Sequence, residues 1–415
     1  MTTPWLSAMV STYASERFLP GCLDDLLAQS LGERLEILVV DACSPEREGE
    51  IVRAYQQRHA NIHYLRTEVR ECSSAAFNRA AALAHAPYLT TANTDDRHHP
   101  EFAARMVAVL EQCPQYGLVY ADSAITRTAH ETWATTTATR RFAWPDFTPA
   151  VALSCCLFGA QPVWRKDAHR AAGPWSTSHR IANDQDMFLR IARVAGAVHL
   201  DEVLGVFLQR DDSVAGSGRR EAVLADALAV MKQHRHSWSI DEIVPGATAQ
   251  GPFAEAAAWF ELGNLCALGP YTDAAAALDC YRTALALPLA GAERAAVQAA
   301  FANNSGCVLA CAGIPDAARR AFAASAPGPL RDHNLALCLA GDRVLQLRDL
   351  RFAELGHPLV ARSRRTHGVR VDAAGRVQTT ASHEQVPWDV FTGPNGVPWA
   401  GAARPTAAST AGLPR

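Results

Sequence analysis

Four short apolar runs alternate with segments of helical spacing along the first hundred residues. The runs cover residues 6–13, 35–40, 62–65 and 87–92, and the helical patterns between them cover residues 19–29, 49–59 and 73–86. Strands that alternate with helices form right-handed βαβ units, because parallel neighbours must be joined by a crossover connection. The pattern therefore predicts an α/β domain built on a mostly parallel sheet with flanking helices.

Polar side chains stand where these apolar runs end. Thr12 and Tyr13 end the first run, Asp41 follows the second, and Asn93-Thr94-Asp95-Asp96 follows the fourth. The carboxyl ends of parallel strands meet at one edge of a sheet, and open α/β sheets bind their ligands there. We therefore expect these side chains to converge on a ligand site.

The adjacent carboxylates Asp95 and Asp96 point to a metal. Two carboxylates at a strand end cannot both lose water cheaply without a counter-charge. A divalent cation such as Mn²⁺ or Mg²⁺, itself bound to substrate phosphates, is the natural counter-charge. The alternative is that the pair forms a solvated turn that caps a helix starting at Pro100, because Asp favours caps and turns.

Composition narrows the class of protein. A length of 415 residues predicts two or more domains, and a net charge of −3 does not favour nucleic acid or an anionic membrane surface. The start of the chain lacks the pattern of a signal peptide, and no apolar run is long enough to span a bilayer. The 11 cysteines are odd in number and form no Cys-x-x-Cys pair, which favours a reducing cytosol. We expect a cytoplasmic protein, with peripheral attachment to the inner face of the membrane as an option.

Three segments resemble a known family. They are LSAMVSTY at residues 6–13, EILVVDACSPE at 36–46 and SSAAFNRAAALAHAPYLTTANTDD at 73–96. In this order they resemble the nucleotide-binding half of glycosyltransferase family 2, which has the GT-A fold, and the resemblance extends over residues 4–215. It implies an inverting, metal-dependent transfer of a sugar from a UDP- or GDP-sugar to a hydroxyl acceptor.

The resemblance also assigns roles to the strand ends. Asn93-Thr94-Asp95 matches the family's Asp-x-Asp motif, with Asn93 in place of the first Asp. A neutral amide can hydrogen-bond a ribose hydroxyl but adds no charge to a metal, so Asp95, helped by Asp96, becomes the main protein ligand of the cation. Phe77 stands where the family often has an arginine, which leaves Arg70, Arg79 or Arg97 as substitutes. The implied nucleotide-binding residues are Thr12, Tyr13, Asp41, Asn93 and Arg210.

A second acidic segment supplies a candidate base. Asn183-Asp184 follows Gly173-Pro174-Trp175 and opens a helical pattern. The family has its catalytic base at such a helix start, so the resemblance makes Asp184 the base. The alternative is that Asp184 only stabilises the helix N-terminus. We expect Asp186 to pair with Arg190 four residues later, and Asp186 and His179 are the next candidates for the base.

Two tryptophans, Trp164 and Trp175, are candidates for binding the acceptor. Trp164 and Trp175 lie in apolar segments that precede the helix of Asp184. A flat aromatic face suits the apolar face of a sugar, which predicts acceptor binding. The alternative is that both rings pack in the core.

The second half of the chain has a different pattern. We expect a glycosyltransferase domain over residues 1–215, a helix and linker over 216–252, helical repeats over 253–345 and a partly disordered extension over 346–415. The repeats resemble degenerate tetratricopeptide units, and the alternative is an ordinary helical bundle. Within the extension, alternation and a glycine predict a hairpin at residues 367–380.

Two other functions remain open beside glycosyl transfer. A non-catalytic sugar-nucleotide binder would recruit a partner through its helical repeats, and Asn93 and Phe77 favour it. A nucleotidyltransferase would need a Gly- and Arg/Lys-rich phosphate loop after the first strand, and TYASERF at residues 12–18 is not one. For the transferase, the acceptor is a surface polysaccharide, a lipid-linked glycan or a peptide, and a protein partner can bind the repeats. No nucleic-acid partner is expected.

Overall fold

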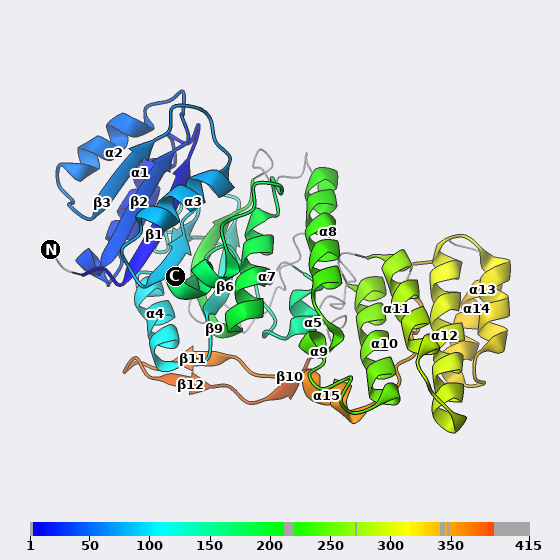
Figure 1. Ribbon diagram of the computed structural model, residues 1–415. Helices are drawn as coiled ribbons and strands as arrows, with labels where there is room; N and C mark the ends of the chain where they lie inside the picture. The colour runs from blue at the N-terminus through cyan, green and yellow to red at the C-terminus, as the bar shows by residue number, and fades with distance from the viewer. Residues whose placement is uncertain are drawn as a thin grey trace.

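The computed structural model describes residues 3–155, 157–210, 220–269, 272–340, 345–346 and 349–385. Figure 1 shows an α/β region built on one large sheet, followed by a row of helices, with the strands β11 and β12 returning from the helices to the sheet. Within the described residues, no helix combines the length and the apolar character needed to cross a membrane.

The first half of the sheet consists of parallel strands, as predicted. They are β1 (Leu6–Thr12), β2 (Leu35–Asp41), β3 (Ile62–Arg66) and β4 (Tyr88–Thr91), paired in the order β4-β1-β2-β3. Every residue of β2 is buried, and so is every residue of β1 except Ser11, because helices cover both faces of these strands. The helices of this half are α1 (Leu19–Leu27), α2 (Glu48–Gln56), α3 (Ser73–Leu83) and α4 (Phe102–Gln112).

The other half of the sheet is mixed. Here β8 (Val163–Arg165) is antiparallel to β4 and β6 (Leu118–Thr126), and β9 (Ala197–Leu208) is parallel to β6. The short strands β5 (Arg97–His98) and β7 (Arg140–Phe142) pair with β9 and β6. The register of β9 against β6 shifts beside Asp122.

Five helices of this part of the described chain lead to the helical region. They are α5 (Pro149–Ala152), α6 (Lys166–Ala172), α7 (Asn183–Ala195), α8 (Arg220–Ser237) and α9 (Ile240–Ile243). The predicted helix at the start of the 216–252 segment is therefore present. Both α5 and α9 pack against the helical region through one shared apolar core that includes Leu153, Ile243 and Phe260.

The C-terminal region is helical. It contains α10 (Pro252–Leu268), α11 (Ala274–Ala286), α12 (Gly291–Cys311), α13 (Pro315–Ala324) and α14 (Pro329–Ala340). A Cβ at Gly263 would lie 2.3 Å from the Tyr281 ring, and one at Gly306 would lie 2.6 Å from the Phe322 ring. The same small-to-large contact thus recurs in two successive helix pairs. The assignment of these helices to the tetratricopeptide family stays a prediction.

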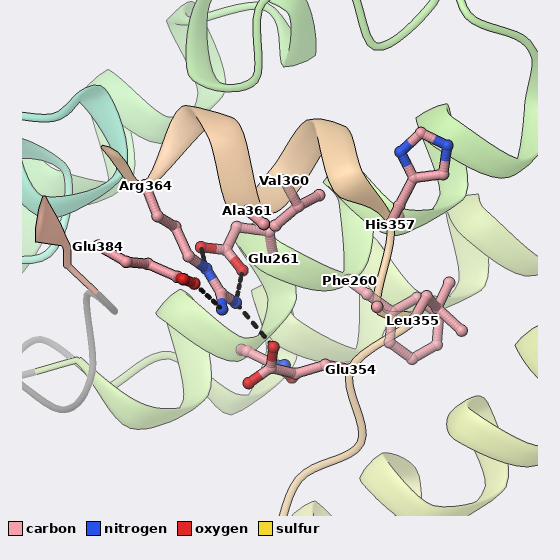
Figure 2. A pocket seen from close by; sticks show the side chains of 12 residues that line it. Phe260, Glu261, Glu354, Leu355, His357, Val360, Ala361, Arg364 and Glu384 are labelled. Carbon is pink, nitrogen blue, oxygen red and sulfur yellow. Dashed lines mark hydrogen bonds and ion pairs between the residues drawn. The ribbon is translucent and has the colours of Figure 1, made fainter. Parts of the chain in front are cut away.

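A C-terminal strap, residues 357–385, leads from the helices back to the sheet. It begins with α15 (Pro358–Ser363), which is attached to α10 by a buried ion pair between Arg364 Nε and Glu261 Oε1 at 2.9 Å (Figure 2). The predicted hairpin is confirmed as β11 (Val369–Val371) and β12 (Val377–Thr379), and β11 also extends the main sheet beside β9. The strap ends with β10 (Arg365–Thr366) paired with β13 (His383–Glu384). Residues from 386 onward, including the tail predicted to be disordered, lie outside the described residues.

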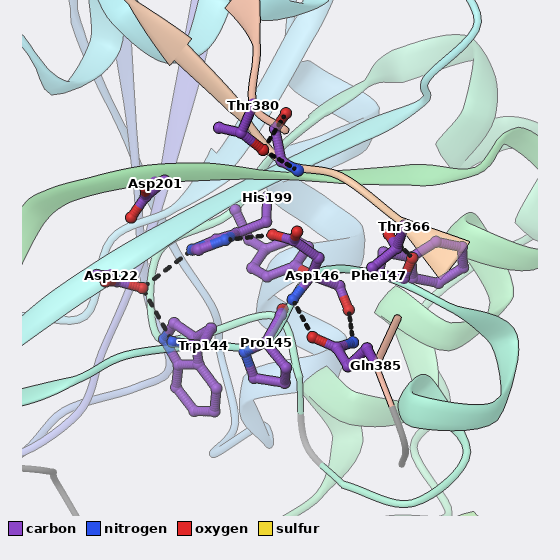
Figure 3. A network of polar contacts seen from close by, with 12 residues as sticks. Asp122, Trp144, Pro145, Asp146, Phe147, His199, Asp201, Thr366, Thr380 and Gln385 are labelled. Carbon is purple, nitrogen blue, oxygen red and sulfur yellow. Dashed lines mark hydrogen bonds and ion pairs between the residues drawn. The ribbon is translucent and has the colours of Figure 1, made fainter. Parts of the chain in front are cut away.

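The strap closes over a buried histidine between two carboxylates. His199 Nε2 lies 3.0 Å from Asp122 Oδ1 and His199 Nδ1 lies 2.9 Å from Asp146 Oδ1 (Figure 3). Gln385 of the strap holds the main chain of Asp146 through two hydrogen bonds. Burial alone would lower the pKa of His199, but hydrogen bonds and charge from Asp122 and Asp146 outweigh it and raise this pKa to about 9.

This arrangement predicts a loss of stability at alkaline pH. A histidine with a folded pKa of about 9 and an unfolded pKa of about 6.5 contributes its full stability below pH 6.5 and loses it as pH rises through 9. We expect the free energy of unfolding to fall by up to about 3 kcal/mol across this range. Urea unfolding at pH 6 and pH 9.5 measures the fall, and His199→Gln should remove most of it. Parallel losses in both proteins would contradict the assignment.

Candidate active site

Asp41 ends β2 as a buried carboxylate with fixed partners. Its Oδ1 accepts a hydrogen bond from the main-chain N–H of Ser44 at 2.7 Å. Its Oδ2 accepts from the Tyr64 hydroxyl at 2.7 Å and pairs with Arg66 Nη1 at 2.5 Å. Tyr64 and Arg66 come from β3 and Ser44 from the loop after β2, so three residues of two neighbouring elements fix the orientation of this carboxylate. Asp41, predicted to bind the nucleotide, thus lies at the carboxyl edge of the sheet, beside the half-exposed Arg66.

The loop after β1 is held by a residue that the sequence did not reveal. Thr12 pairs in register with Asp41, and its buried hydroxyl has no hydrogen-bond partner among the described residues. Fully buried Glu48 accepts hydrogen bonds from Ser15 N at 2.9 Å and from Ser44 Oγ at 2.7 Å. Glu48 therefore joins the loop after β1 to the loop after β2. In the sequence, Glu48 resembles any acidic residue at the start of a polar helix.

Arg70 is the best placed of the three arginines proposed to substitute at Phe77. Its guanidinium lies 4.1 Å from the centroid of the Tyr13 ring, and its side chain is exposed. Arg79 is paired with Glu71 on the surface. Arg97 is buried and donates to main-chain carbonyls, so it supports the loop after β4 from inside.

Of the two adjacent carboxylates after β4, Asp95 faces solvent and Asp96 is buried. Asp95 is partly exposed, and its Oδ2 lies 3.6 Å from Arg210 Nη1. Asp96 is 1% exposed, and its two oxygens accept hydrogen bonds from Asn93 Nδ2 at 2.9 Å and Leu208 N at 3.1 Å. Burial, and then the charge of Asp95, raise the pKa of Asp96 to about 7. Asp96 was predicted as a metal ligand, and its engaged oxygens instead give it a role in holding Asn93 and β9 in place.

Strand β9 delivers Arg210 to this acidic loop. The guanidinium lies 3.6 Å from Asp95 and 4.7 Å from the centroid of the Phe18 ring. A cation between a carboxylate and an aromatic face is restrained at the site edge, where a phosphate can approach it. Arg210, predicted to bind the nucleotide, and Asp95, predicted to bind the metal, are therefore neighbours.

The donor set fits a cation that is held partly by its substrate. The described residues contain no group of three or more His, Cys, Asp or Glu side chains that could hold a metal by themselves. Mg²⁺ is commonly bound through one or two carboxylates together with substrate phosphates and water. Asp95, which is partly exposed, offers one such carboxylate.

Asp184 lies in the first turn of α7, as predicted. Asn183 fixes this turn, because its Nδ2 donates to Ser73 Oγ at 3.1 Å and Ser74 Oγ at 2.8 Å, where α3 begins. Asp184 Oδ1 accepts the main-chain N–H of Gln185 at 2.7 Å. Burial outweighs this bond and raises the pKa of Asp184 to about 6. A carboxyl with such a pKa suits proton transfer near neutral pH.

The two other candidates for the base are engaged elsewhere. Asp186 pairs with Arg190 Nη2 at 2.8 Å, which confirms the predicted contact, and its second oxygen lies 3.0 Å from His234 Nε2. His179 lies 3.3 Å from Asp226, whose other oxygen accepts the main-chain N–H groups of residues 181 and 182 just before α7. Asp186 and Asp226 therefore position the turn that carries Asp184.

The two tryptophans predicted to bind the acceptor lie in the core. Trp164 is fully buried and Trp175 is 2% exposed, and both rings contact Phe188 of α7. The Phe77 ring packs against Trp175 at 5.0 Å between centroids. A ring enclosed by protein cannot stack on a sugar, so the structure corrects this prediction to a packing role. The apolar segments were compatible with either role.

The order and geometry of these strand ends agree with one family description. Residues 7–164 match the model of Glycosyl transferase family 2. This range contains β1 to β4, Asp41 and the Asn93–Asp96 loop, and it ends before Asp184 and Arg210. The helical region lies outside the matched residues.

Several curated glycosyltransferases are similar over the same part of the chain. The uncharacterized glycosyltransferase EpsJ of Bacillus subtilis (strain 168) is 32% identical over 109 residues, which are 26% of this chain and 31% of that protein. Glycosyltransferase GlyG of Streptococcus pneumoniae serotype 4 is 28% identical over 91 residues, which are 22% of this chain and 30% of that protein. The chain spans about a third of the length of these curated relatives.

The solved structures that match this chain are distant from it in sequence. S. aureus TarS 1-349 in complex with UDP-GlcNAc is 15% identical, with a TM-score of 0.49, covering 91% of this chain and 96% of that one. Mannosyltransferase PcManGT from Pyrobaculum calidifontis, in complex with GDP-Man and Mn²⁺, is 16% identical with a TM-score of 0.41, covering 82% and 80% of the two chains.

Proposed function

We propose that this protein is an inverting, divalent-cation-dependent glycosyltransferase that moves a sugar from a UDP- or GDP-sugar to a hydroxyl acceptor. The observation that carries the proposal is the placement of Asp41, Asp95 and Arg210 at strand ends of one sheet, of which residues 7–164 match Glycosyl transferase family 2. Asp184, with its raised pKa at the start of α7, supplies the group that a mere binder would not need.

In this proposal the strand ends hold the donor. Asp41 would receive the nucleotide base in exchange for Tyr64 or Arg66, its present partners, and the buried hydroxyl of Thr12 beside it offers a further hydrogen bond. Asn93 meets the ribose, since its Nδ2 is fixed by Asp96 while its side chain remains exposed. Exposed Arg70, next to Tyr13, and Arg210 contact the diphosphate.

Asp95 would hold Mn²⁺ or Mg²⁺ together with oxygens of the diphosphate. Such a cation, when bound, neutralises charge on the departing diphosphate. Arg210 lies beside Asp95 and adds a second positive group that can exchange its carboxylate partner for a phosphate oxygen.

Asp184 would take the proton of the acceptor hydroxyl while the oxygen attacks the anomeric carbon. The C–O bond to the diphosphate breaks on the opposite face, which inverts the anomeric centre. Asn183, Asp186 and Asp226 hold this turn through hydrogen bonds to α3, α8 and the chain before α7. Positioning of this kind is needed because a base acts only within hydrogen-bond reach of its proton.

The domain boundaries at residues 215, 252 and 345 remain part of the proposal. The helices of residues 253–345 would bind a polysaccharide, lipid-linked glycan or peptide acceptor, or a protein partner, in the cytoplasm or at the inner face of the membrane. The alternative is a sugar-nucleotide binder without turnover, which the presence of Asn93 and Phe77 at two motif positions favours.

A donor screen separates these functions. Purified protein is incubated with UDP- and GDP-sugars, with Mn²⁺ or with EDTA, and the nucleotide released by slow hydrolysis is measured. The transferase should release UDP or GDP from one donor class, at least about 10-fold faster with Mn²⁺. Binding of a nucleotide sugar without release in either condition would favour the binder, and release of pyrophosphate would indicate a nucleotidyltransferase.

A further inference from the structure

Four buried asparagines of the helical region contact the segment at residues 349–355. They come from α10, α12 and α14, and all are fully buried: Asn264, Asn303, Asn304 and Asn334. Their amides are linked to one another across the helices, because Asn334 donates to Asn303, Asn303 to Asn304 and Asn304 to Asn264, each at 3.0 Å. Asparagine is disfavoured in helix interiors relative to alanine, so four of them at connected positions indicate a binding role.

These asparagines bind the main chain of the segment at residues 349–355. Asn334 accepts the N–H of Arg351 at 2.7 Å and donates to its carbonyl at 2.7 Å. Asn304 does the same for Ala353, at 2.6 Å and 3.1 Å. Asn303 and Asn264 add a second donor to each carbonyl, at 2.9 Å and 3.2 Å. Each carboxamide thus replaces the edge of a neighbouring strand for every second residue of an extended peptide.

Two apolar side chains of this segment face the helices, and two of its charged side chains are exposed. Arg351 and Glu354 are exposed, while Leu350 is buried and Phe352 packs against the helices. Figure 2 shows Glu354 and Leu355 beside Phe260 of α10, near the start of α15. A hollow of about 350 Å³ follows the segment, between Asn303 of α12 and the turn at residues 325–331. The helices therefore bind the main chain of this segment and the apolar side chains at alternate positions. The hollow leaves space along one side of the segment.

We propose that α10, α12 and α14 form a binding groove for an extended polypeptide, and that residues 349–355 are a built-in occupant that a partner polypeptide displaces. Main-chain recognition explains why another sequence can substitute, because Asn304 and Asn334 contact only the N–H and carbonyl groups of the residues they hold. An occupant on the same chain has an effective concentration of about millimolar order, so it also limits which partners can bind. The inference does not depend on glycosyl transfer.

A peptide from the chain itself tests the groove. A fluorescent peptide of residues 349–357 is titrated into the full-length protein and into the Leu350→Ala/Phe352→Ala protein, and anisotropy is followed. The two substitutions weaken the internal occupant, so the peptide should bind this protein at least about 10-fold more tightly than wild type. Asn334→Ala added to the same protein should reduce the binding again.

Two altered peptides show whether the main chain is read. Arg351→Pro removes the N–H that Asn334 accepts, and Arg351→Ala keeps this N–H while removing the exposed side chain. The proline peptide should lose binding by at least about 10-fold, and the alanine peptide should bind like the parent. Equal binding of the two peptides would overturn main-chain recognition.

A second measurement on the wild-type protein covers the case in which the double variant does not fold. Hydrogen exchange of residues 349–355 is measured with and without excess unlabelled peptide. Faster exchange of the Arg351 and Ala353 amides when peptide is present indicates displacement. Unchanged exchange at saturating peptide would show that the segment is a permanent part of the helical core, and would overturn the proposal.

Discussion

Replacing Asp184 by asparagine should lower turnover by at least about 10²-fold while donor affinity stays nearly unchanged. The proposed base acts on the acceptor's proton in the transition state and does not contact the nucleotide. The amide has nearly the same shape as the carboxylate, so the first turn of α7 should persist. Initial rates with a saturating donor and calorimetry of UDP binding measure the two effects separately.

The pH profile gives an independent check on Asp184. The base must be ionised, and its pKa is raised to about 6, so kcat should rise with pH through about 6 and level off above it. Asp184→Asn should lose this acidic limb. Asp316→Asn is the matched control, because Asp316 is an exposed first-turn acid of α13, far from the strand ends in sequence. Near-normal turnover of Asp184→Asn would withdraw the assignment and leave Asp186 or His179 to be tested.

The strand ends were predictable because local pattern and topology agree there. Parallel strands place their carboxyl ends at one edge, so Thr12, Asp41 and Asp95 could be grouped before any coordinates were known. The contact between Asp186 and Arg190 followed from helical spacing alone. Strand ends and contacts within one helix were predictable because each depends on a short stretch of sequence.

The contacts that cross long stretches of sequence were not predictable. In the sequence, Glu48 resembles any acidic residue of a helix, and only the fold shows that it joins the loops after β1 and β2. In the same way, the sequence does not distinguish Asp96 from Asp95, because the hydrogen bonds of Asp96 to Asn93 and Leu208 depend on the fold. The burial of Trp164 depends on α7, which arrives later in the chain.

The role of the strap was missed for the same reason. The hairpin at residues 367–380 was recognisable from its alternation, but its pairing with β9 depends on where the helical region returns the chain. A protein shortened near residue 218 would therefore lose two strands of the main sheet together with the helices. Lost activity in such a protein would not by itself assign catalysis to the helical region.

Replacing Asp95 by asparagine should remove the manganese-dependent part of UDP binding. Asn93 is already neutral and Asp96 has both oxygens bonded within the protein, so neither can replace the lost charge. Loss of residues that merely orient metal ligands typically costs 10–100-fold in metal affinity, and loss of a direct ligand should cost at least about 100-fold. Calorimetry of UDP with Mn²⁺ and with EDTA measures this difference.

Two comparisons make the Asp95 experiment decisive. The affinity for UDP in EDTA should change little, because the contacts at Asp41 and Thr12 remain. Asp96→Asn should instead lower the free energy of unfolding, because an amide cannot accept both the Asn93 and the Leu208 hydrogen bonds. If Asp95→Asn keeps the full manganese effect and Asp96→Asn loses it, the buried carboxylate is the ligand, and the loop must rearrange on binding the donor.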